Sequence, residues 1–183
     1  MSEAGPRWID NHCHLGSDAV EAIAAARVDG VVKFIDVGCD LATSQGCVDH
    51  AAAFEGVYAT VGLHPHEARH GLGGLEELLA RPHVIAVGEC GLDYHYDHSP
   101  RDEQRAMFAA QIEMANRHEL PLVIHTREAW EETFDILDHE GFPERTIFHC
   151  FIGCLDEARA SVDRGGWLSF SGIVSFKSAT DVQ

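Results

Sequence analysis

Apolar runs rich in valine and isoleucine alternate along this chain with segments that have the periodicity of amphipathic helices. Seven such runs are expected to form β-strands: Trp8–His12, Val31–Val37, Val57–Gly62, Val84–Gly88, Leu122–His125, Thr146–His149 and Trp167–Ser171. Strands that alternate with helices in this way predict βα units arranged around a parallel sheet.

The segments between the runs contain helix signals. Ser99 is expected to cap a helix in which Pro100 takes the first position and which ends near His118. Apolar residues recur at helical spacing in two further segments. The first contains Val20, Ile23 and Ala24 and is expected to end near Gly30. The second contains Trp130, Thr133, Phe134 and Leu137 and is expected to end at Gly141.

This order of elements predicts an α/β fold, a (β/α)8 TIM-like barrel that lacks its eighth strand. A barrel of this kind closes when the eighth strand pairs with both the first and the seventh. Residues 1–183 are therefore expected to be a single barrel domain that is truncated at its C-terminus, or one whose open edges are covered in an assembly.

Composition narrows the functional classes. The chain has 183 residues, of which 45% are hydrophobic, and it contains neither an apolar stretch long enough to span a membrane nor a secretion signal, so a cytoplasmic protein without membrane partners is expected. The six cysteines form no CxxC pair, which argues against a disulfide framework. The net charge of −17, with only two lysines, argues against tracking along duplex DNA.

Imidazole and carboxylate side chains stand at or just after the ends of several predicted strands. In a barrel of alternating strands and helices these ends open onto one face, so the side chains converge there. The candidate metal ligands are His12, His14, Glu89, His125 and His149. They predict a two-metal hydrolase site, with Glu89 able to bridge both ions through its two oxygens. Two cations would also make the pocket locally positive.

Further polar residues are expected around this site. His64 and His66 end the third predicted strand and are assigned to the rim of the pocket. Asp93 follows Glu89 in a predicted loop and is expected to contact substrate or support the ligands, although an ordinary turn would explain it too. Arg127 can hold a phosphate oxygen, or it can form a surface salt bridge with a neighbouring glutamate.

The motifs IDNHCHL, VGLHPHE, VGECGLDY, LVIHTRE, FHCFIGC and LSFSGIVSF, in this order, resemble those of the TatD-type metal-dependent deoxyribonucleases. The resemblance implies that His12 and His14 hold a first divalent ion, that His125 and His149 hold a second, and that Glu89 bridges them. It also implies hydrolysis of phosphodiester bonds in DNA, in some members as a 3′→5′ exonuclease on single strands. Single strands or strand ends are therefore the expected substrate.

The family pattern includes one more aspartate ligand, after an eighth strand, and no such motif occurs here. In a two-metal mechanism, in which a hydroxide attacks phosphorus, His64 or bulk water would then have to accept the proton. Two alternatives stay open: an amidohydrolase-like enzyme acting on a small ester, amide or phosphoester, and an inactive fragment that lacks the last ligand. The sequence does not decide between Mg²⁺, Mn²⁺ and Zn²⁺, nor does it give the oligomeric state.

Overall fold

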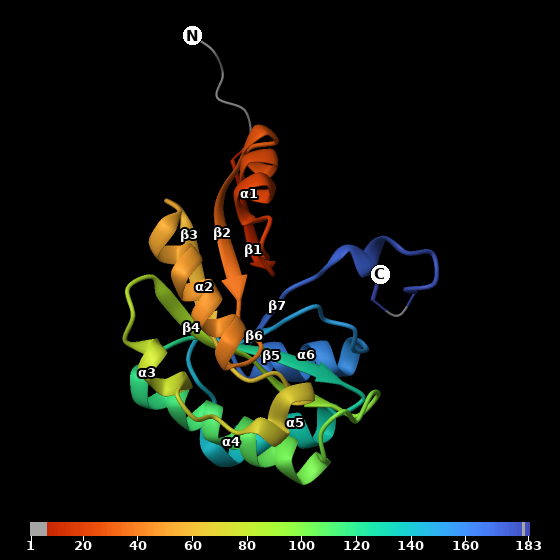
Figure 1. Ribbon diagram of the computed structural model, residues 1–183. Helices are drawn as coiled ribbons and strands as arrows, with labels where there is room; N and C mark the ends of the chain where they lie inside the picture. The colour runs from red at the N-terminus through yellow and green to blue at the C-terminus, as the bar shows by residue number, and fades with distance from the viewer. Residues whose placement is uncertain (1–6, 181) are drawn as a thin grey trace.

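The seven predicted runs form the seven strands of one parallel sheet in the computed structural model, which describes residues 7–180 and 182–183. The strands are β1 (Trp8–Cys13), β2 (Val31–Val37), β3 (Val57–Val61), β4 (Val84–Asp93), β5 (Leu122–Arg127), β6 (Ile147–Phe148) and β7 (Trp167–Leu168). They pair in chain order, and the sheet curls into part of a barrel (Figure 1). Within the described ranges there is no eighth strand. The predicted α/β barrel lacking its last strand is therefore confirmed.

Helices connect successive strands, as parallel neighbours require. They are α1 (Ala19–Val28), α2 (Leu41–Ala53), α3 (Leu75–Leu79), α4 (Arg101–His118), α5 (Trp130–Glu140) and α6 (Leu155–Asp163), with 3₁₀ turns η1 (Pro65–His70) and η2 (Gly172–Ser175). In Figure 1, α3, α4 and α5 lie together along one outer side of the curled sheet. No helix in the part of the chain that the structure describes has both the length and the apolar character to cross a membrane.

The core lies between the sheet and these helices. Its largest fully enclosed aromatic side chains are Phe108 on α4 and Phe148 on β6. Ile112 and Leu137 add buried aliphatic side chains from α4 and α5. Their burial fixes the two helices on the sheet, so the strands beneath them present their polar ends at defined positions.

The start of α4 differs from the prediction. The helix begins at Arg101 with Pro100 at the N-cap, so Ser99 does not cap it. The Ser99 hydroxyl instead donates a hydrogen bond to the carbonyl oxygen of His66 at 2.7 Å and accepts one from the backbone N–H of Arg69 at 3.2 Å. The serine thus holds the η1 segment against the start of α4, which positions His66.

Two strands run further than their apolar residues predict. β4 continues to Asp93 and β5 to Arg127, because the backbones of the two strands keep pairing through Gly91 opposite His125. Glu89 and His125 therefore lie within strands, where the backbone ladder holds them, and Asp93 is the last residue of a strand, whereas a loop position was predicted. Side-chain polarity ended the predicted strands too early, since ladder pairing depends on the backbone.

Candidate metal centre

Glu89 lies at the centre of the cluster of polar side chains inside the curled sheet. Its side chain is almost entirely enclosed, with the residue 4% exposed. One carboxylate oxygen, Oε2, is 3.2 Å from His12 Nε2. The other, Oε1, is 3.2 Å from His125 Nδ1 and 3.8 Å from His64 Nε2. A single carboxylate thus contacts imidazoles carried by β1, by β5 and by the segment after β3.

The first group of donors with the spacing of a metal site contains His12, His14 and Glu89. His14 Nδ1 is 2.9 Å from the carbonyl oxygen of Val37 on β2. Because a carbonyl oxygen only accepts, the Nδ1 of His14 carries the hydrogen, and its Nε2 is left to bind a cation. The neighbouring strand therefore sets both the tautomer and the orientation of this histidine.

The second group contains His64, Glu89 and His125, and in each group the candidate donor atoms lie within 4.8 Å of one another. His149, which was predicted to share an ion with His125, stacks its ring on that of His12, with centroids 3.3 Å apart and planes 9° apart. The structure thus brings all five predicted ligands to one place and adds His64 to them. How they divide between ions stays a prediction.

The side chains fit a divalent cation. His149 Nδ1 is buried and has no hydrogen-bond partner among the described residues. Buried His12 Nε2 lies 3.2 Å from the Glu89 carboxylate but, among the same residues, does not have the geometry of a hydrogen bond. A buried polar atom without a partner is costly, and a cation would provide one. Imidazole nitrogens together with one carboxylate are donors that suit zinc and similar ions, whereas a site for calcium would consist mainly of oxygen atoms.

The enclosed position alters the protonation of these groups. Burial lowers the pKa of His64 to about 3 and, together with the charge of His12, that of His149 to about 4. Burial raises the pKa of Glu89, but its contacts with His12 and His125 outweigh burial and hold that pKa well below its ordinary value. The carboxylate is therefore ionised at neutral pH, as a metal ligand must be.

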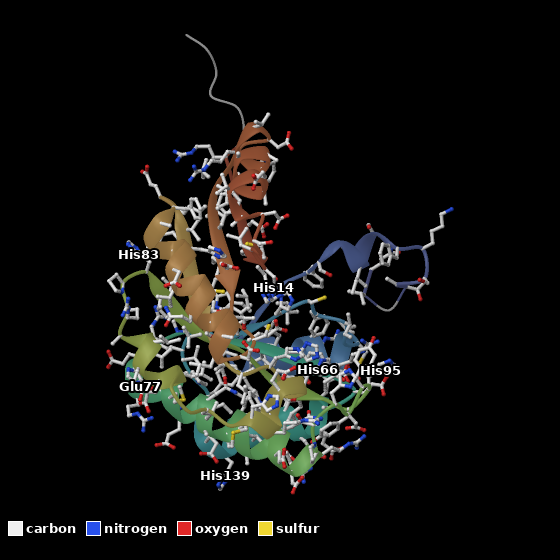
Figure 2. The ribbon with its side chains drawn as sticks, in the orientation of Figure 1. His14, His66, Glu77, His83, His95 and His139 are labelled. Atoms are coloured by element: carbon white, nitrogen blue, oxygen red, sulfur yellow. The ribbon has the colours of Figure 1, made fainter. Side chains whose placement is uncertain are left out.

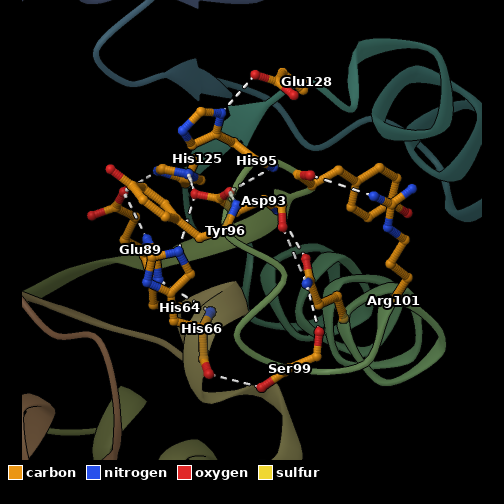
Figure 3. A network of polar contacts seen from close by, with 12 residues as sticks. His64, His66, Glu89, Asp93, His95, Tyr96, Ser99, Arg101, His125 and Glu128 are labelled. Carbon is orange, nitrogen blue, oxygen red and sulfur yellow. Dashed lines mark hydrogen bonds and ion pairs between the residues drawn. The ribbon is translucent and has the colours of Figure 1, made fainter.

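Asp93 orients two of the histidines. Its Oδ2 is 2.9 Å from His125 Nε2 and 3.0 Å from His66 Nε2. Its Oδ1 accepts hydrogen bonds from the backbone N–H groups of His95 and Tyr96. Burial raises the pKa of Asp93, yet these hydrogen bonds prevail and lower it. The side chain that was predicted as a substrate contact or as support for the ligands thus bonds directly to His125 in the structure (Figure 3).

Sequence reasoning missed three buried polar residues that support the site. Gln111 on α4 holds both the backbone N–H and the carbonyl oxygen of Leu63, directly before His64. Asp36 on β2 accepts the backbone N–H of Leu15, directly after His14, at 2.8 Å. Gln104 on α4 likewise hydrogen-bonds both the backbone N–H and the carbonyl oxygen of Asp93. Two glutamines seven positions apart on the helix were the available signal.

We expect the substitution Gln104→Leu to destabilise the protein by about 1–3 kcal/mol, because it leaves the backbone N–H of Asp93 and the carbonyl oxygen of Ser99 buried without their partner. Urea denaturation monitored by circular dichroism measures the loss. Gln45→Leu is the matched control, since among the described residues the Gln45 side chain bonds only to exposed Asp49 on its own helix, and we expect a change within about 0.5 kcal/mol. Equal stability of the two variants would contradict this role of Gln104.

Some other histidines lie away from this cluster. His83 and His139 lie at the outside of the molecule, whereas His14 and His66 point toward the middle (Figure 2). His95 and His98, which the sequence gave no reason to place at the site, lie next to it, with the His98 ring 4.5 Å from that of His66.

Arg127 lies at the edge of the same cluster. Its guanidinium stacks over the ring of Tyr96, 4.8 Å from the centroid. The predicted alternative was a salt bridge with an adjacent glutamate, but Glu128 pairs with His95 instead, at 2.7 Å. Within residues 7–180 and 182–183, no ion pair involves Arg127, so its N–H groups remain available to an anion.

Comparison with known families and curated proteins agrees with the resemblance seen in the motifs. The model of the family described as TatD related DNase matches residues 9–183. An uncharacterised metal-dependent hydrolase, YabD of Bacillus subtilis, is 37% identical over 180 residues, which are 93% of this chain and 71% of that protein. A 3′-5′ ssDNA/RNA exonuclease, TatD of Cronobacter sakazakii, is 34% identical over 163 residues, which are 86% of this chain and 62% of that protein.

Solved structures share the fold. The crystal structure of YJJV, a TatD homologue from Escherichia coli, superposes with a TM-score of 0.86 at 27% identity and covers 96% of this chain and 73% of that one. A TatD family hydrolase from Entamoeba histolytica gives a TM-score of 0.83 at 19% identity and covers 96% of this chain and 69% of that one. The curled sheet is therefore the arrangement of TatD proteins.

Proposed function

Because the chain belongs to the TatD related DNase family, we propose that it hydrolyses phosphodiester bonds in DNA, with single strands or strand ends as substrate. Its relatives are named metal-dependent hydrolases and nucleases, and the chain is a metal-dependent hydrolase of this kind, acting on ester bonds. The observation that carries the proposal is the position of Glu89, which belongs to both groups of candidate metal donors.

The proposed cofactor is a pair of divalent ions, Mg²⁺, Mn²⁺ or Zn²⁺. Such ions lower the pKa of a water molecule toward neutrality and polarise the phosphoryl oxygen. His12 and His14 would hold one ion, and His125 and His149 the other, with Glu89 between them. His64, whose Nε2 lies 3.8 Å from Glu89 Oε1, or bulk water is proposed to accept the proton that the attacking water releases. Burial lowers the pKa of His64 to about 3, which favours bulk water as the acceptor.

The charge of the chain supports a substrate that touches the protein at few phosphates. A net charge of −17 repels a long polyanion, whereas a strand end needs only the reacting phosphate and its neighbours to be held. Arg127, whose guanidinium has no carboxylate partner among the described residues, is proposed to hold one of these phosphates. Relatives named 3′-5′ ssDNA/RNA exonucleases support hydrolysis from the 3′ end, and the cytoplasm is the proposed location.

The test is degradation of single-stranded DNA labelled at its 5′ end, with and without added Mg²⁺, Mn²⁺ or Zn²⁺. We expect progressive shortening from the 3′ end that requires a metal ion and stops when a chelator is added, because the ions activate the water. A small phosphoester, a carboxylic ester and a cyclic amide are assayed in parallel. Turnover of one of these while DNA remains intact would contradict the nuclease proposal and favour an amidohydrolase-like reaction.

A further inference from the structure

The segment that follows β4 places an exposed aromatic ring beside the metal-binding cluster. Tyr96 is 50% exposed, although its ring has aromatic neighbours on several sides. The ring of His98 is nearly parallel to it, at a 9° angle and a centroid distance of 5.4 Å. The ring of His66 meets it edge-on at 5.6 Å. Because parallel rings at this distance are offset, part of the flat face of each is left uncovered.

A cation lies against the same ring. The Arg127 guanidinium is 4.8 Å from the Tyr96 centroid, within the range of a cation–π contact. Stacking occupies the face of the guanidinium and leaves the N–H groups at its edge free to bind an anion. A flat aromatic surface next to these N–H groups offers the two kinds of contact that a nucleotide needs, one for the base and one for the phosphate.

This surface is rigidly connected to the candidate metal ligands. The Asp93 carboxylate accepts the backbone N–H of Tyr96 at 2.9 Å through one oxygen, and through the other it contacts His125 Nε2, also at 2.9 Å. The same oxygen contacts His66 Nε2 at 3.0 Å. One side chain therefore fixes the distance between the aromatic ring and the metal-binding histidine, and Figure 3 shows them in the same network.

We propose that Tyr96, His98 and Arg127 form a stacking platform for a nucleobase of a single-stranded nucleic acid, next to the scissile phosphate. The base stacks on the exposed part of the Tyr96–His98 pair, and Arg127 holds the adjoining phosphate. The inference rests on the proposed nuclease function and deepens it. Paired bases have their faces covered by their neighbours, so the platform selects unpaired strands, and because every base has a π-face it selects weakly among sequences.

The test measures binding separately from turnover. Fluorescently labelled thymidylate and uridylate decamers with phosphorothioate linkages, and an abasic decamer with the same linkages, are titrated with the protein by fluorescence anisotropy. We expect the base-bearing strands to bind at least about tenfold more tightly than the abasic strand. In Tyr96→Ala this ratio falls toward one, whereas Tyr96→Trp preserves it because tryptophan also stacks. Phe176→Ala is the control, because Phe176 is a similarly exposed aromatic residue (59%) outside the platform, and we expect it to preserve the binding ratio.

The outcomes separate this inference from the proposed function. If the thymidylate or the uridylate strand shows the ratio and Tyr96→Ala abolishes it, the platform is supported, and the strand concerned identifies DNA or RNA as the ligand. If neither strand binds better than the abasic one, or if Tyr96→Ala keeps the full ratio, the platform is overturned. A protein that shows the base-dependent ratio and yet cleaves no nucleic acid would contradict the nuclease function and leave the platform standing.

Discussion

Replacing Glu89 with glutamine is expected to reduce metal-dependent hydrolysis of single-stranded DNA at least about 100-fold, because it removes the negative charge that both donor groups share. Glutamine has nearly the same size and shape, so the fold should persist. Its amide cannot provide two anionic oxygens as metal ligands, and its NH₂ group would lie next to the imidazole nitrogens without being able to bind a cation. The measurement is kcat/KM for the end-labelled strand, together with metal content after dialysis.

Glu113→Gln is the matched control. Glu113 lies on the outer side of α4, where its side chain is 68% exposed and pairs with Arg117 one turn away. Because surface substitutions of this kind have small effects, the same loss of charge should leave activity within about twofold of the wild type. Equal activity of the Glu89→Gln variant and the wild type, at equal metal concentration, would show that hydrolysis does not depend on this carboxylate. A Glu89→Gln variant that binds metal normally but is inactive would place the role of Glu89 in the reaction rather than in metal binding.

The substitution Gly91→Ala is expected to destabilise the protein by about 3 kcal/mol or more and to weaken metal binding as well. Gly91 has φ +133°, a conformation that residues with a Cβ rarely adopt, and a Cβ there would overlap the backbone carbonyl oxygen of His125. Since Gly91 and His125 pair across β4 and β5, the two strands must separate at His125, a candidate metal ligand. Urea denaturation measures the stability, and titration with Zn²⁺ measures the binding.

Gly46→Ala offers the opposite result with the same chemical change. Gly46 lies inside helix α2, and a Cβ added there would meet nothing within 4 Å. Alanine is the better helix former, so we expect this variant to gain about 0.5–1 kcal/mol in stability. A Gly91→Ala variant as stable as Gly46→Ala would mean that β4 and β5 do not approach each other as closely as the structure places them.

The strands and their order could be predicted because burial on both faces of a parallel sheet produces uninterrupted apolar runs. Val31–Val37 was predicted at both of its ends, and α4 was predicted to end at His118, where the structure ends it. The extension of β4 to Asp93 could not be predicted, because its residues after Gly88 are not an apolar run. The strand continues because its backbone pairs with β5, with Gly91 opposite His125. Local sequence reports what the side chains prefer, whereas strand pairing depends on a neighbour far away in the chain.

The convergence of the candidate ligands on one place could be predicted because the strand ends of a barrel meet at one face, whereas their binding of metal stays a prediction. What could not be predicted is how the rings are oriented. The stacking of His149 on His12 depends on how the turn after β6 is placed relative to β1, and no local residue pattern encodes that placement. The sequence did not indicate that Tyr96 and His98 lie at the site, because the role of an exposed aromatic residue in a loop depends on its neighbours in space.

If each group of donors holds a cation, as proposed, Glu89 also couples the two binding events thermodynamically. A cation held by either group withdraws negative charge from the carboxylate that the other group needs, and it fixes the rotamer in which that carboxylate is offered. The free energy of cation binding to one group would therefore depend on whether the other group is occupied, and this coupling would be equal in both directions. A cation-binding isotherm would then need two binding steps and a coupling constant between them. The second cation would bind with lower apparent affinity than the first, because Glu89 already binds the first.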